Sequence, residues 1–517
     1  MLRHVTTFLV LVFAQAVFLL PKVDVTGFRQ HEGPMLGINE IPDLSTRVLD
    51  YKVNVSLKLP IFKTDTRFLS HNVESAIFNK TNFNFSSTKL QTLMRGLAPA
   101  YLRVGGTSSD FVTFQNPCKE EVAKRNHHKQ TILCPQDWIR LNDFCLATGL
   151  HLVYALNQLK RTEDGQWDPT NTEKLLDFNT YDVPAWELGN EPNSYLSHAN
   201  ISLSGEQIGQ DFNVLRTIFN KRSNYRNAVI FGPDINIRGA IVTTIFLERF
   251  VAATNATNGT TFHCYYLDGS TATLDDFIDP EVLDVLPGEI NLIKSTVDKY
   301  YGKEAKPMLG ETGSAYNGGA KNLSDRYVAG FMLLDKLGMS AKMGLDVVMR
   351  AALYGSDYTM LDLDNLDPKP TYWSAYIYKR LVNTTVLEAN VVNTNSSKDD
   401  RIVRVYAHCT STEKSGYDAG AVTLIVMNLH KGHSANITLL QELYGQDVDQ
   451  YLLTPHGPLG MTSLQIELNN NLLAMVDDRT LPEIKHVRLK GGRQLVLPPL
   501  SYGFYVVNNA KAESCIG

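Results

Sequence analysis

The chain has 517 residues, of which 44% are hydrophobic, 9% aromatic and 20% charged. This apolar content is enough for a large core and excludes a disordered, collagenous or coiled-coil protein. The 49 basic and 54 acidic residues give a formal net charge of -5, so the chain lacks the positive field of a protein that binds nucleic acid non-specifically. At ~150 residues per domain, a chain of this length fits a two-part protein in which one part is a large α/β barrel.

Residues 1–20 have the pattern of a cleaved secretory signal peptide. Arg3 precedes an apolar stretch from Val5 to Leu20, and Ala14-Gln15-Ala16 has the small-x-small form of a signal-peptidase site. The alternative is an N-terminal membrane anchor. The stretch is short and no second apolar run of ~20 residues follows, so we expect secretion and no stable membrane insertion.

Ten N-x-S/T sequons agree with secretion and predict a glycoprotein. They begin at Asn54, Asn79, Asn84, Asn200, Asn255, Asn258, Asn322, Asn383, Asn395 and Asn436.

The six cysteines are an even count, as expected in an oxidising compartment, and none has the paired CxxC spacing of a zinc site. Four of them can form two disulfides, Cys118 with Cys134 and Cys409 with Cys515. The first would close a short polar loop, and the second would tie the C-terminus to an earlier strand. Cys145 and Cys264 lie in apolar contexts and are expected to be buried free thiols rather than nucleophiles.

Residues 60–375 alternate short β-branched runs with amphipathic stretches, which predicts an α/β fold. The eight expected strands are Asn72–Phe78, Pro99–Gly106, His151–Gln158, Val183–Pro192, Ala228–Ile235, Thr261–Gly269, Lys306–Gly313 and Leu345–Gly355. Between the last two, Ser324–Leu337 is typical of a helix that has Ser324 as its N-cap and ends at Gly338. Eight such alternations predict a (β/α)8 barrel, which carries its chemistry at the C-terminal ends of the strands.

Residues 376–517 change to strands and turns without long helical intervals, which predicts a C-terminal β-sandwich domain. The expected strands are Arg401–Cys409, Ala421–Leu429, Ala435–Leu440, Gln450–Thr454, Leu472–Val476, Gln494–Leu497 and Tyr502–Asn508. Within residues 45–59, the stretch from Tyr51 to Leu59 alternates apolar and polar residues as a half-buried strand does. This strand either completes the sandwich or caps the barrel, and the pattern favours neither.

Two glutamates stand at the ends of expected barrel strands. Glu191 closes the fourth run within Trp186–Asn193, and Glu311 closes the seventh within Met308–Thr312. One glutamate at a strand end is usually a cap or a salt-bridge partner. Two on the same rim fit a glycosidase, which needs one carboxyl group to protonate the departing oxygen and another to attack the anomeric carbon.

Four segments closely resemble the heparanase family of retaining endo-β-glucuronidases. They are Trp186–Tyr195, which contains the highly specific string WELGNEPNS, with His263–Gly269, Gly310–Tyr316 and Ser324–Gly338. The similarity spans nearly the whole mature chain. It implies an endo-β-glucuronidase that hydrolyses internal linkages of glycosaminoglycans and needs neither a metal nor another cofactor. By this resemblance, Glu191 is the acid/base and Glu311 is the nucleophile.

The resemblance also implies a set of substrate-binding residues: Asn190, Thr107, Glu74, His263, Tyr265, Gly318 and Tyr358. Asn190 would hydrogen-bond the sugar 2-hydroxyl, and Glu74 stands where the family has an aspartate. Tyr265 would donate to Glu311 or serve only as a core aromatic residue. His263 would orient the nucleophile or be a core histidine with its hydrogen bonds satisfied.

The implied roles set physical requirements on the two carboxyl groups. Glu191 needs a raised pKa to hold a proton at working pH, whereas Glu311 needs to stay ionised. In a retaining enzyme the two groups should lie ~5 to 5.5 Å apart, too close to admit an attacking water between them.

Two departures from the vertebrate heparanases bear on maturation and substrate. Phe111–Trp138 is short where those proteins carry an excised linker, so we expect no two-chain maturation. This chain also has fewer basic residues around the expected cleft than those proteins have. Ser270 occupies an arginine position, Ser197-His198 replaces a lysine pair, and Asn236–Gly239 keeps only Arg238. Each lost cation removes a charge-assisted contact to sulfate, which favours a poorly sulfated substrate.

Heparan sulfate and hyaluronan both remain as expected substrates, because leech-type hyaluronidases of the same family share Ser324–Tyr327 and cleave unsulfated hyaluronan. The alternative function is a catalytically silent glycosaminoglycan-binding protein, which the presence of both glutamates disfavours. We expect a glycosaminoglycan partner, no nucleic acid, and a location in the extracellular matrix or, as a second option, the lysosome.

Overall fold

The structure, a computed structural model, describes residues 48–80, 83–118, 130–237, 239–302, 306–393 and 400–516. The expected signal peptide, Arg238 and the sequon at Asn395 lie outside the described residues. Within the described residues, no helix has both the length and the apolar character that a membrane span requires.

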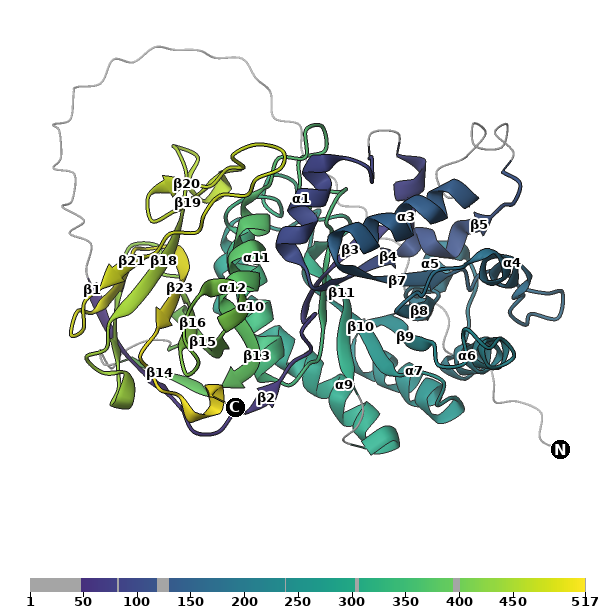
Figure 1. Ribbon diagram of the computed structural model, residues 1–517. Coiled ribbons are helices and arrows are strands. Elements are labelled where there is room, and N and C mark those ends of the chain that lie inside the picture. Colours follow the sequence, from purple (N-terminus) through teal and green to yellow (C-terminus); the bar gives the residue numbers. More distant parts are fainter. Residues whose placement is uncertain are drawn as a thin grey trace, which may run out of the picture. The chain divides into compact units, whose positions relative to one another are not determined.

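Eight parallel strands close into a barrel, which confirms the predicted (β/α)8 architecture (Figure 1). In chain order they are β3 (Leu69–Glu74), β4 (Ala100–Gly105), β7 (Leu150–Leu156), β8 (Ala185–Leu188), β9 (Val229–Asn236), β10 (Gly259–Asp268), β11 (Pro307–Tyr316) and β12 (Val348–Ala351). The barrel closes where β12 pairs with β3. The first strand is shorter than expected because residues 75–79 form a 3-10 turn after Glu74.

Helices follow the barrel strands. The helices of the described residues are α1 (Thr88–Leu97), α3 (Pro135–Thr148), α4 (Thr170–Phe178), α5 (Tyr195–Ala199), α6 (Gly205–Asn220), α7 (Ala240–Ala253), α8 (Pro280–Leu283), α9 (Val285–Tyr301), α10 (Ala329–Lys342), α11 (Pro370–Leu381) and α12 (Thr412–Ser415). Helix α6 shows why they begin where they do: Ser204 and Gln207 form a reciprocal capping box that satisfies two free N–H groups. Helix α3 ends at Gly149, which adopts the left-handed conformation.

The predicted bounds of one helix are wrong at both ends. Helix α10 begins at Ala329, because the Ser324 hydroxyl accepts the backbone N–H of Ala320 (2.8 Å) instead of capping a helix. Gly338 does not end the helix, which continues to Lys342. This glycine is required by packing: a Cβ at Gly338 would lie 2.1 Å from the ring of Tyr406.

The C-terminal domain contains two sheets, as the sandwich prediction requires. The larger is made of β2 (Phe62–Lys63), β13 (Val382–Leu387), β15 (Val403–Thr410), β16 (Val422–Asn428), β23 (Ser501–Val507), β18 (Val448–Pro455), β19 (Ile466–Leu468), β20 (Asn471–Leu472) and β21 (Val487–Leu489). The smaller is made of β14 (Ala389–Asn393), β1 (Val48–Val55), β17 (Ser434–Leu439) and β22 (Leu495–Leu497). A separate pair, β5 (Val112–Phe114) and β6 (Thr131–Leu133), lies beside the barrel.

The N-terminal strand belongs to the smaller sheet rather than capping the barrel. β1 pairs antiparallel with β14 and parallel with β17. Its alternating residues Tyr51, Val53 and Val55 are buried in the core of this domain, as expected for a strand with one face buried.

Helix α11 spans the expected domain boundary at residues 375 and 376, and the strands that follow it begin at Val382. One expected strand is wrong. In the expected strand Leu472–Val476, only Leu472 is extended and paired, in the two-residue strand β20.

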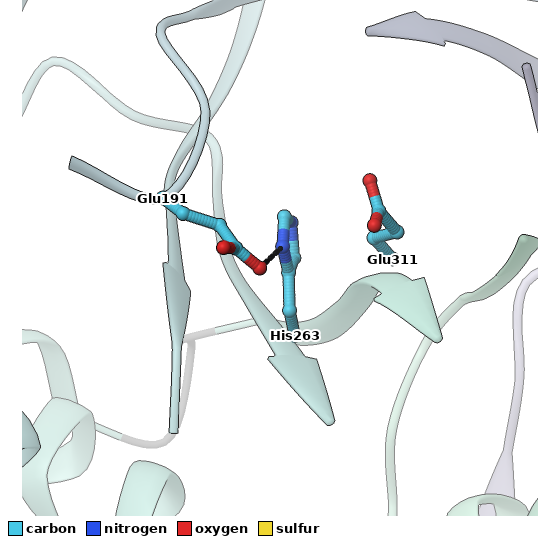
Figure 2. A group of neighbouring side chains, drawn as sticks. All are labelled: Glu191, His263 and Glu311. Atoms are coloured by element: carbon cyan, nitrogen blue, oxygen red, sulfur yellow. Dashed lines mark hydrogen bonds and ion pairs between the residues drawn. The ribbon is translucent and has the colours of Figure 1, made fainter. Parts of the chain in front are cut away.

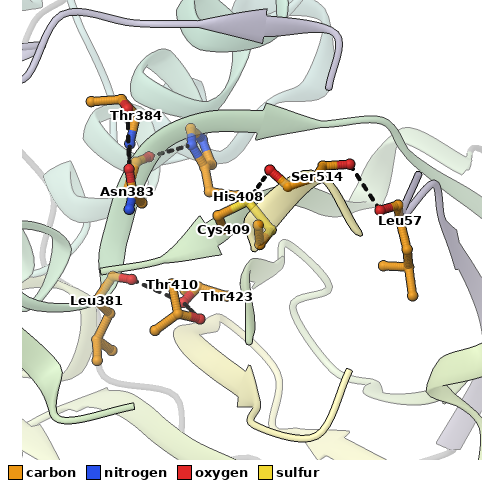
Figure 3. The surroundings of a disulfide bond; sticks show 10 residues. Leu57, Leu381, Asn383, Thr384, His408, Cys409, Thr410, Thr423 and Ser514 are labelled. Atoms are coloured by element: carbon orange, nitrogen blue, oxygen red, sulfur yellow. Dashed lines mark hydrogen bonds between the residues drawn. A yellow bond between two sulfur atoms is a disulfide. The ribbon is translucent and has the colours of Figure 1, made fainter. Parts of the chain in front are cut away.

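Both predicted disulfides are present, and they join Cys118 to Cys134 and Cys409 to Cys515. Figure 3 shows the second one, which fastens the C-terminus to β15. Beside it, Ser514 donates its backbone N–H (3.1 Å) and its hydroxyl (2.8 Å) to the carbonyl oxygen of Leu57. Cys145 and Cys264 are buried free thiols, as predicted.

Candidate active site

A cleft of about 900 Å³ opens at the C-terminal ends of the barrel strands. Eight predicted site residues line it together: Glu74, Thr107, Glu191, His263, Tyr265, Glu311, Gly318 and Tyr358. Asn190 is the exception: it is buried next to Glu191, and its side-chain oxygen Oδ1 accepts a hydrogen bond from Arg103. The closed barrel therefore brings residues from six strands and the loops after them to one site, at the end where a (β/α)8 barrel is expected to carry its chemistry.

Glu191 and Glu311 face one another across this cleft, with His263 between them (Figure 2). One carboxylate oxygen of each glutamate and one ring nitrogen of His263 all lie within 4.8 Å of one another. Glu191 follows β8 and has a left-handed backbone (φ 49°), and Pro192 begins a 3-10 turn directly after it. Glu311 lies within β11.

A β-bulge sets the direction of the side chains around Glu311. Phe262 of β10 pairs with Leu309 of β11, but the next pair is His263 with Glu311, so Gly310 is an extra residue. Such a bulge re-aims the side chains that follow it. Only glycine fits there, because a Cβ at residue 310 would lie 2.5 Å from Asp234 Oδ1.

Three donors hold the carboxylate of Glu311. Tyr265 Oη donates to Oε1 (2.7 Å), which confirms the predicted contact, while Arg103 Nη1 (2.9 Å) and Asn72 Nδ2 (3.2 Å) donate to Oε2. These three contacts fix the position of the Glu311 carboxylate, as a nucleophile requires.

Arg103 was missed as a site residue, although it is the centre of the buried polar network. Its guanidinium is fully buried and donates to Glu187 (2.6 Å), to Asn190 Oδ1 (2.9 Å) and to Glu311, and it lies 3.7 Å from Asp234. Burial raises the pKa of Glu187 to about 8 even though Arg103 opposes the shift. The available signal was the presence of single charged residues inside two apolar strands, which require a buried partner.

Asp110 was also missed, and it fixes the loop that carries Asn190. Its carboxyl group accepts the backbone N–H groups of Gln158 (2.9 Å) and Asn190 (3.0 Å) and the hydroxyl group of Tyr195 (2.9 Å). Burial raises the pKa of Asp110 to about 7 against these hydrogen bonds. The predicted contact of Asn190 with a sugar hydroxyl stays a prediction.

Of the two roles left open for His263, orienting the nucleophile or being a core histidine with its hydrogen bonds satisfied, the contacts fit the second, because both ring nitrogens are hydrogen-bonded, to Glu191 and to Asp234. Its Nδ1 lies 3.0 Å from Glu191 Oε1, and its Nε2 lies 3.2 Å from Asp234 Oδ1. Burial acts to lower the pKa of His263, but the charge of Glu311, the hydrogen bonds with Asp234 and Glu191, and the charge of Glu191 outweigh it and raise this pKa to about 10. His263 is therefore a cation between two carboxylates at neutral pH.

The expected raised pKa of Glu191 is wrong for this state of the site. Burial acts to raise the pKa of Glu191, but the hydrogen bonds from His263 and from Asn236 Nδ2 (2.8 Å), with the charge of His263, lower it below its ordinary value. The proton that an acid/base residue requires is thus on His263, which is hydrogen-bonded to Glu191. Protonation of the two residues is therefore treated as that of a coupled pair.

Glu74 supplies a third carboxyl group to the cleft. Its Oε2 accepts the backbone N–H (3.3 Å) and the hydroxyl group (2.6 Å) of Ser108. Gly106 makes room for it, because a Cβ there would lie 2.2 Å from Glu74 Oε1. Burial first, and then the charge of Glu311, raise the pKa of Glu74 to about 7.

The rest of the cleft lining has few basic side chains, as the sequence predicts. Ser197 and His198 line the cleft, and Tyr358 stacks on Tyr265 with ring centroids 6.2 Å apart. Ser270 lies outside the lining and donates to Asp268 (2.7 Å). Among the described residues that line the cleft, none is lysine or arginine.

Glu191, His263 and Glu311 also have a spacing at which three side chains can hold a metal ion. Each carboxylate already accepts hydrogen bonds from protein donors. The raised pKa keeps His263 protonated, and a metal ligand needs the neutral ring. The arrangement therefore suits proton transfer better than metal binding.

Comparisons of the sequence with known proteins identify its family. The N-terminal domain of glycosyl hydrolase family 79 matches residues 71–338. Heparanase of Gallus gallus is 37% identical, covering 90% of this chain and 96% of that protein. The inactive heparanase-2 of Homo sapiens is 33% identical, covering 90% and 89%, and the hyaluronoglucuronidase of Hirudo nipponia is 31% identical, covering 84% and 91%.

Comparison of the fold with solved structures leads to other glycoside hydrolases. A 4-O-α-L-rhamnosyl-β-D-glucuronidase from Fusarium oxysporum has a TM-score of 0.64 at 16% sequence identity, covering 88% of this chain and 100% of that one. This likeness concerns the fold alone. The family match and the relatives more than 30% identical over most of their length place this chain in glycosyl hydrolase family 79.

Proposed function

We propose that this chain is a retaining endo-β-glucuronidase that hydrolyses internal glucuronide linkages of glycosaminoglycans. The observation that carries the proposal is the approach of Glu191 and Glu311, whose nearest carboxylate oxygens lie within 4.8 Å. Retaining glycosidases have carboxyl groups ~5 to 5.5 Å apart, whereas inverting ones need ~6.5 to 9.5 Å to admit a water molecule. The spacing supports double displacement.

In the first step, a carboxylate oxygen of Glu311 attacks the anomeric carbon while the bond to the leaving sugar breaks. Glu191 gives its proton to the departing oxygen. In the second step, Glu191 takes a proton from a water molecule, whose oxygen attacks the same carbon and releases Glu311. Arg103 and Tyr265 hold Glu311 in position for both steps.

His263 supplies the proton that Glu191 lacks in the free site. The negative charge of Glu311 is the largest of the influences that raise the pKa of His263. As Glu311 bonds to the sugar, this charge disappears and the pKa of His263 falls. The proton therefore moves toward Glu191 Oε1, 3.0 Å away, when the leaving oxygen needs it.

A poorly sulfated glycosaminoglycan fits the cleft better than a densely sulfated one. Sulfate groups are best held by charge-assisted hydrogen bonds from arginine or lysine. The described lining of the cleft offers histidines, hydroxyl groups and amides in their place. Relatives named heparanase and hyaluronoglucuronidase keep both heparan sulfate and hyaluronan among the proposed substrates.

The second candidate function is a catalytically silent glycosaminoglycan-binding protein. A relative named inactive heparanase-2, at 33% identity, supports this candidate. The presence of both glutamates, with donors in place on each, favours turnover. Activity on a polymer decides between the two.

We also infer secretion to the extracellular matrix or the lysosome, with glycosylation. Six sequon asparagines are exposed, namely Asn79, Asn84, Asn200, Asn255, Asn258 and Asn322. Asn436 is buried and donates to Asp50, so it is not expected to carry a glycan. Mass spectrometry of protein secreted from eukaryotic cells tests this set.

The decisive experiment digests purified heparan sulfate, chondroitin and hyaluronan with the full chain and analyses the products. We expect shorter chains with glucuronate at the new reducing end and retained β configuration in the first product seen by NMR. Glu311→Gln should abolish cleavage and spare polymer binding. Binding without cleavage by the unaltered protein would support the silent candidate, and an inverted product would refute double displacement.

A further inference from the structure

A buried lysine lies directly behind the two strands that carry most of the catalytic groups. Lys336 belongs to α10, and only 3% of it is exposed. Its Nζ donates to the carbonyl oxygens of Cys264 (3.1 Å) and Gly313 (2.8 Å) and to Thr312 Oγ1 (2.5 Å). Thr312 Oγ1 in turn donates to the carbonyl oxygen of Cys264 (2.5 Å). One ammonium group thus joins β10 to β11.

The residues that Lys336 contacts alternate with residues of the active site. Cys264 lies between His263 and Tyr265 on β10, and Thr312 directly follows Glu311 on β11. Successive side chains of a strand point to opposite faces, so His263, Tyr265 and Glu311 face the cleft while Cys264 and Thr312 face α10. Two of the residues that Lys336 contacts are therefore the immediate chain neighbours of three groups of the site.

The contact falls next to an interruption of the pairing between β10 and β11. The bulge at Gly310 breaks the regular register just before the pair His263 and Glu311. The next pair is Cys264 with Thr312. A bulge leaves one residue unpaired and disrupts the local ladder of hydrogen bonds. Lys336 adds cross-strand hydrogen bonds immediately after this disruption.

Helix α10 is itself fixed from its other side. Asp335, the neighbour of Lys336, accepts hydrogen bonds from Tyr406 Oη (2.6 Å) and Arg404 Nη1 (3.2 Å) of β15 in the C-terminal domain. Gly338, one turn further along, packs against the ring of Tyr406. Two adjacent residues of one helix thus connect the C-terminal domain to the catalytic strands.

The chemistry of the contact is unusual for a residue that only fills space. The three acceptors of Lys336 Nζ are neutral, and the ring centroid of Tyr266 lies 4.1 Å from it. The charges of Glu289 and Asp335 also act on Lys336, but neither carboxyl group is among its hydrogen-bond acceptors. Burial of a cation costs stability that an apolar side chain of similar length would not cost. A role in holding backbone atoms in place accounts for the charge.

We propose that Lys336 is a positioning residue that sets the spacing between Glu311, His263 and Tyr265 by clamping β10 to β11 behind the cleft. The proposal rests on the proposed glycosidase function, since the positions that it sets are those of the reacting groups. Misplacement by a fraction of an ångström is enough to impair a preorganised site.

The test compares three variants of the full chain. Lys336→Met removes the donors and keeps the length, and Thr312→Val removes the hydroxyl group that joins the strands and keeps the shape. Lys379→Met is the matched control, because Lys379 is also buried but donates to the carbonyl oxygen of Pro99 (2.6 Å), before β4 and away from the cleft. For each variant, kcat, KM, the pH profile and the melting temperature are measured on a cleaved polymer.

We expect Lys336→Met and Thr312→Val to lower kcat by about 10- to 100-fold while KM changes by less than about threefold. Their pH profiles should shift, because Tyr265 and His263 no longer sit at the same distances from the two carboxylates. Lys379→Met should retain the kcat and pH profile of the unaltered protein, even with a lower melting temperature.

Values of kcat for the two site variants equal to that of Lys379→Met, or a change confined to KM, would overturn the proposal. Should Lys336→Met fail to fold, Thr312→Val decides the question alone. Absence of activity in the unaltered protein would instead refute the proposed function, which separates the two failures.

Discussion

The imidazole of His263 lies 3.0 Å from the carboxylate of Glu191, Nδ1 to Oε1, on the side away from Asp234. This contact holds one proton between a residue whose pKa is raised to about 10 and a carboxyl group whose pKa is lowered. In the proposed mechanism the acid for glycoside cleavage is therefore this pair of residues rather than Glu191 alone. The first prediction concerns this pair.

His263→Gln keeps a hydrogen-bonding side chain but removes the shared proton. In the unaltered protein His263 keeps its proton up to its pKa of about 10, so a proton is available to Glu191 into the alkaline range. In the variant, Glu191 is the only residue of the pair that can bind this proton. We expect the alkaline limb of the pH profile of kcat to move to lower pH. A limb that stays in place or moves upward would show that His263 merely lowers the pKa of Glu191.

Glu74→Gln tests the third carboxyl group of the cleft. The pKa of Glu74 is raised to about 7, so this group is neutral below that pH and charged above it. The charged form repels both Glu311 and the carboxylate of a glucuronate unit. We expect kcat/KM of the unaltered protein to fall as pH rises through about 7, and the amide variant to lose this fall. A limb near pH 7 that persists in Glu74→Gln would assign it to another group.

Gly310→Ala tests the bulge beside the nucleophile. The added Cβ would lie 2.5 Å from Asp234 Oδ1 and 2.9 Å from the Cβ of Thr261, so β11 has to move. We expect kcat/KM to fall by about 10-fold or more, because Glu311 moves with the strand. Gly288→Ala in α9 is the control, since a Cβ there meets nothing within 4 Å and should stabilise the helix by about 0.5 to 1 kcal/mol. Equal kinetics in both variants would contradict the role of the bulge.

The disulfide between Cys409 and Cys515 is expected to matter for stability rather than for catalysis. It joins residues 106 positions apart, whereas the Cys118 to Cys134 bridge joins residues 16 positions apart. Because the longer loop restricts the unfolded chain more, replacing both Cys409 and Cys515 with serine should lower the free energy of unfolding by about 2 to 4 kcal/mol. Denaturant unfolding measures this loss, and kcat well below the melting temperature should not change. A fall in kcat under those conditions would place the C-terminus among the parts that shape the site.

The order of residues along the chain was sufficient to predict the barrel, its active rim and the two facing glutamates. These features depend on local patterns: alternation of apolar runs with helical stretches, and carboxyl groups at the ends of two of those runs. The two disulfides were predicted from the context of their cysteines, because one pair brackets a short polar stretch and the other links the C-terminus to an expected strand.

The protonation of the site depended on contacts that no local pattern contains. The pKa values of His263 and Glu191 are shifted by side chains from β9 and β11, namely Asp234, Asn236 and Glu311, which the closed barrel brings together. Electrostatic interactions between buried groups vary steeply with distance and burial, and neither quantity is available from residue order.

Helix α10, which carries Lys336, was likewise predictable from the sequence only in part. Its amphipathic pattern predicted a helix but not its bounds, because the hydroxyl group of Ser324 bonds to a turn and the ring of Tyr406 requires Gly338 inside the helix. The apolar spacing of a helix is encoded locally, whereas its ends and its buried polar partners are set by the elements packed against it.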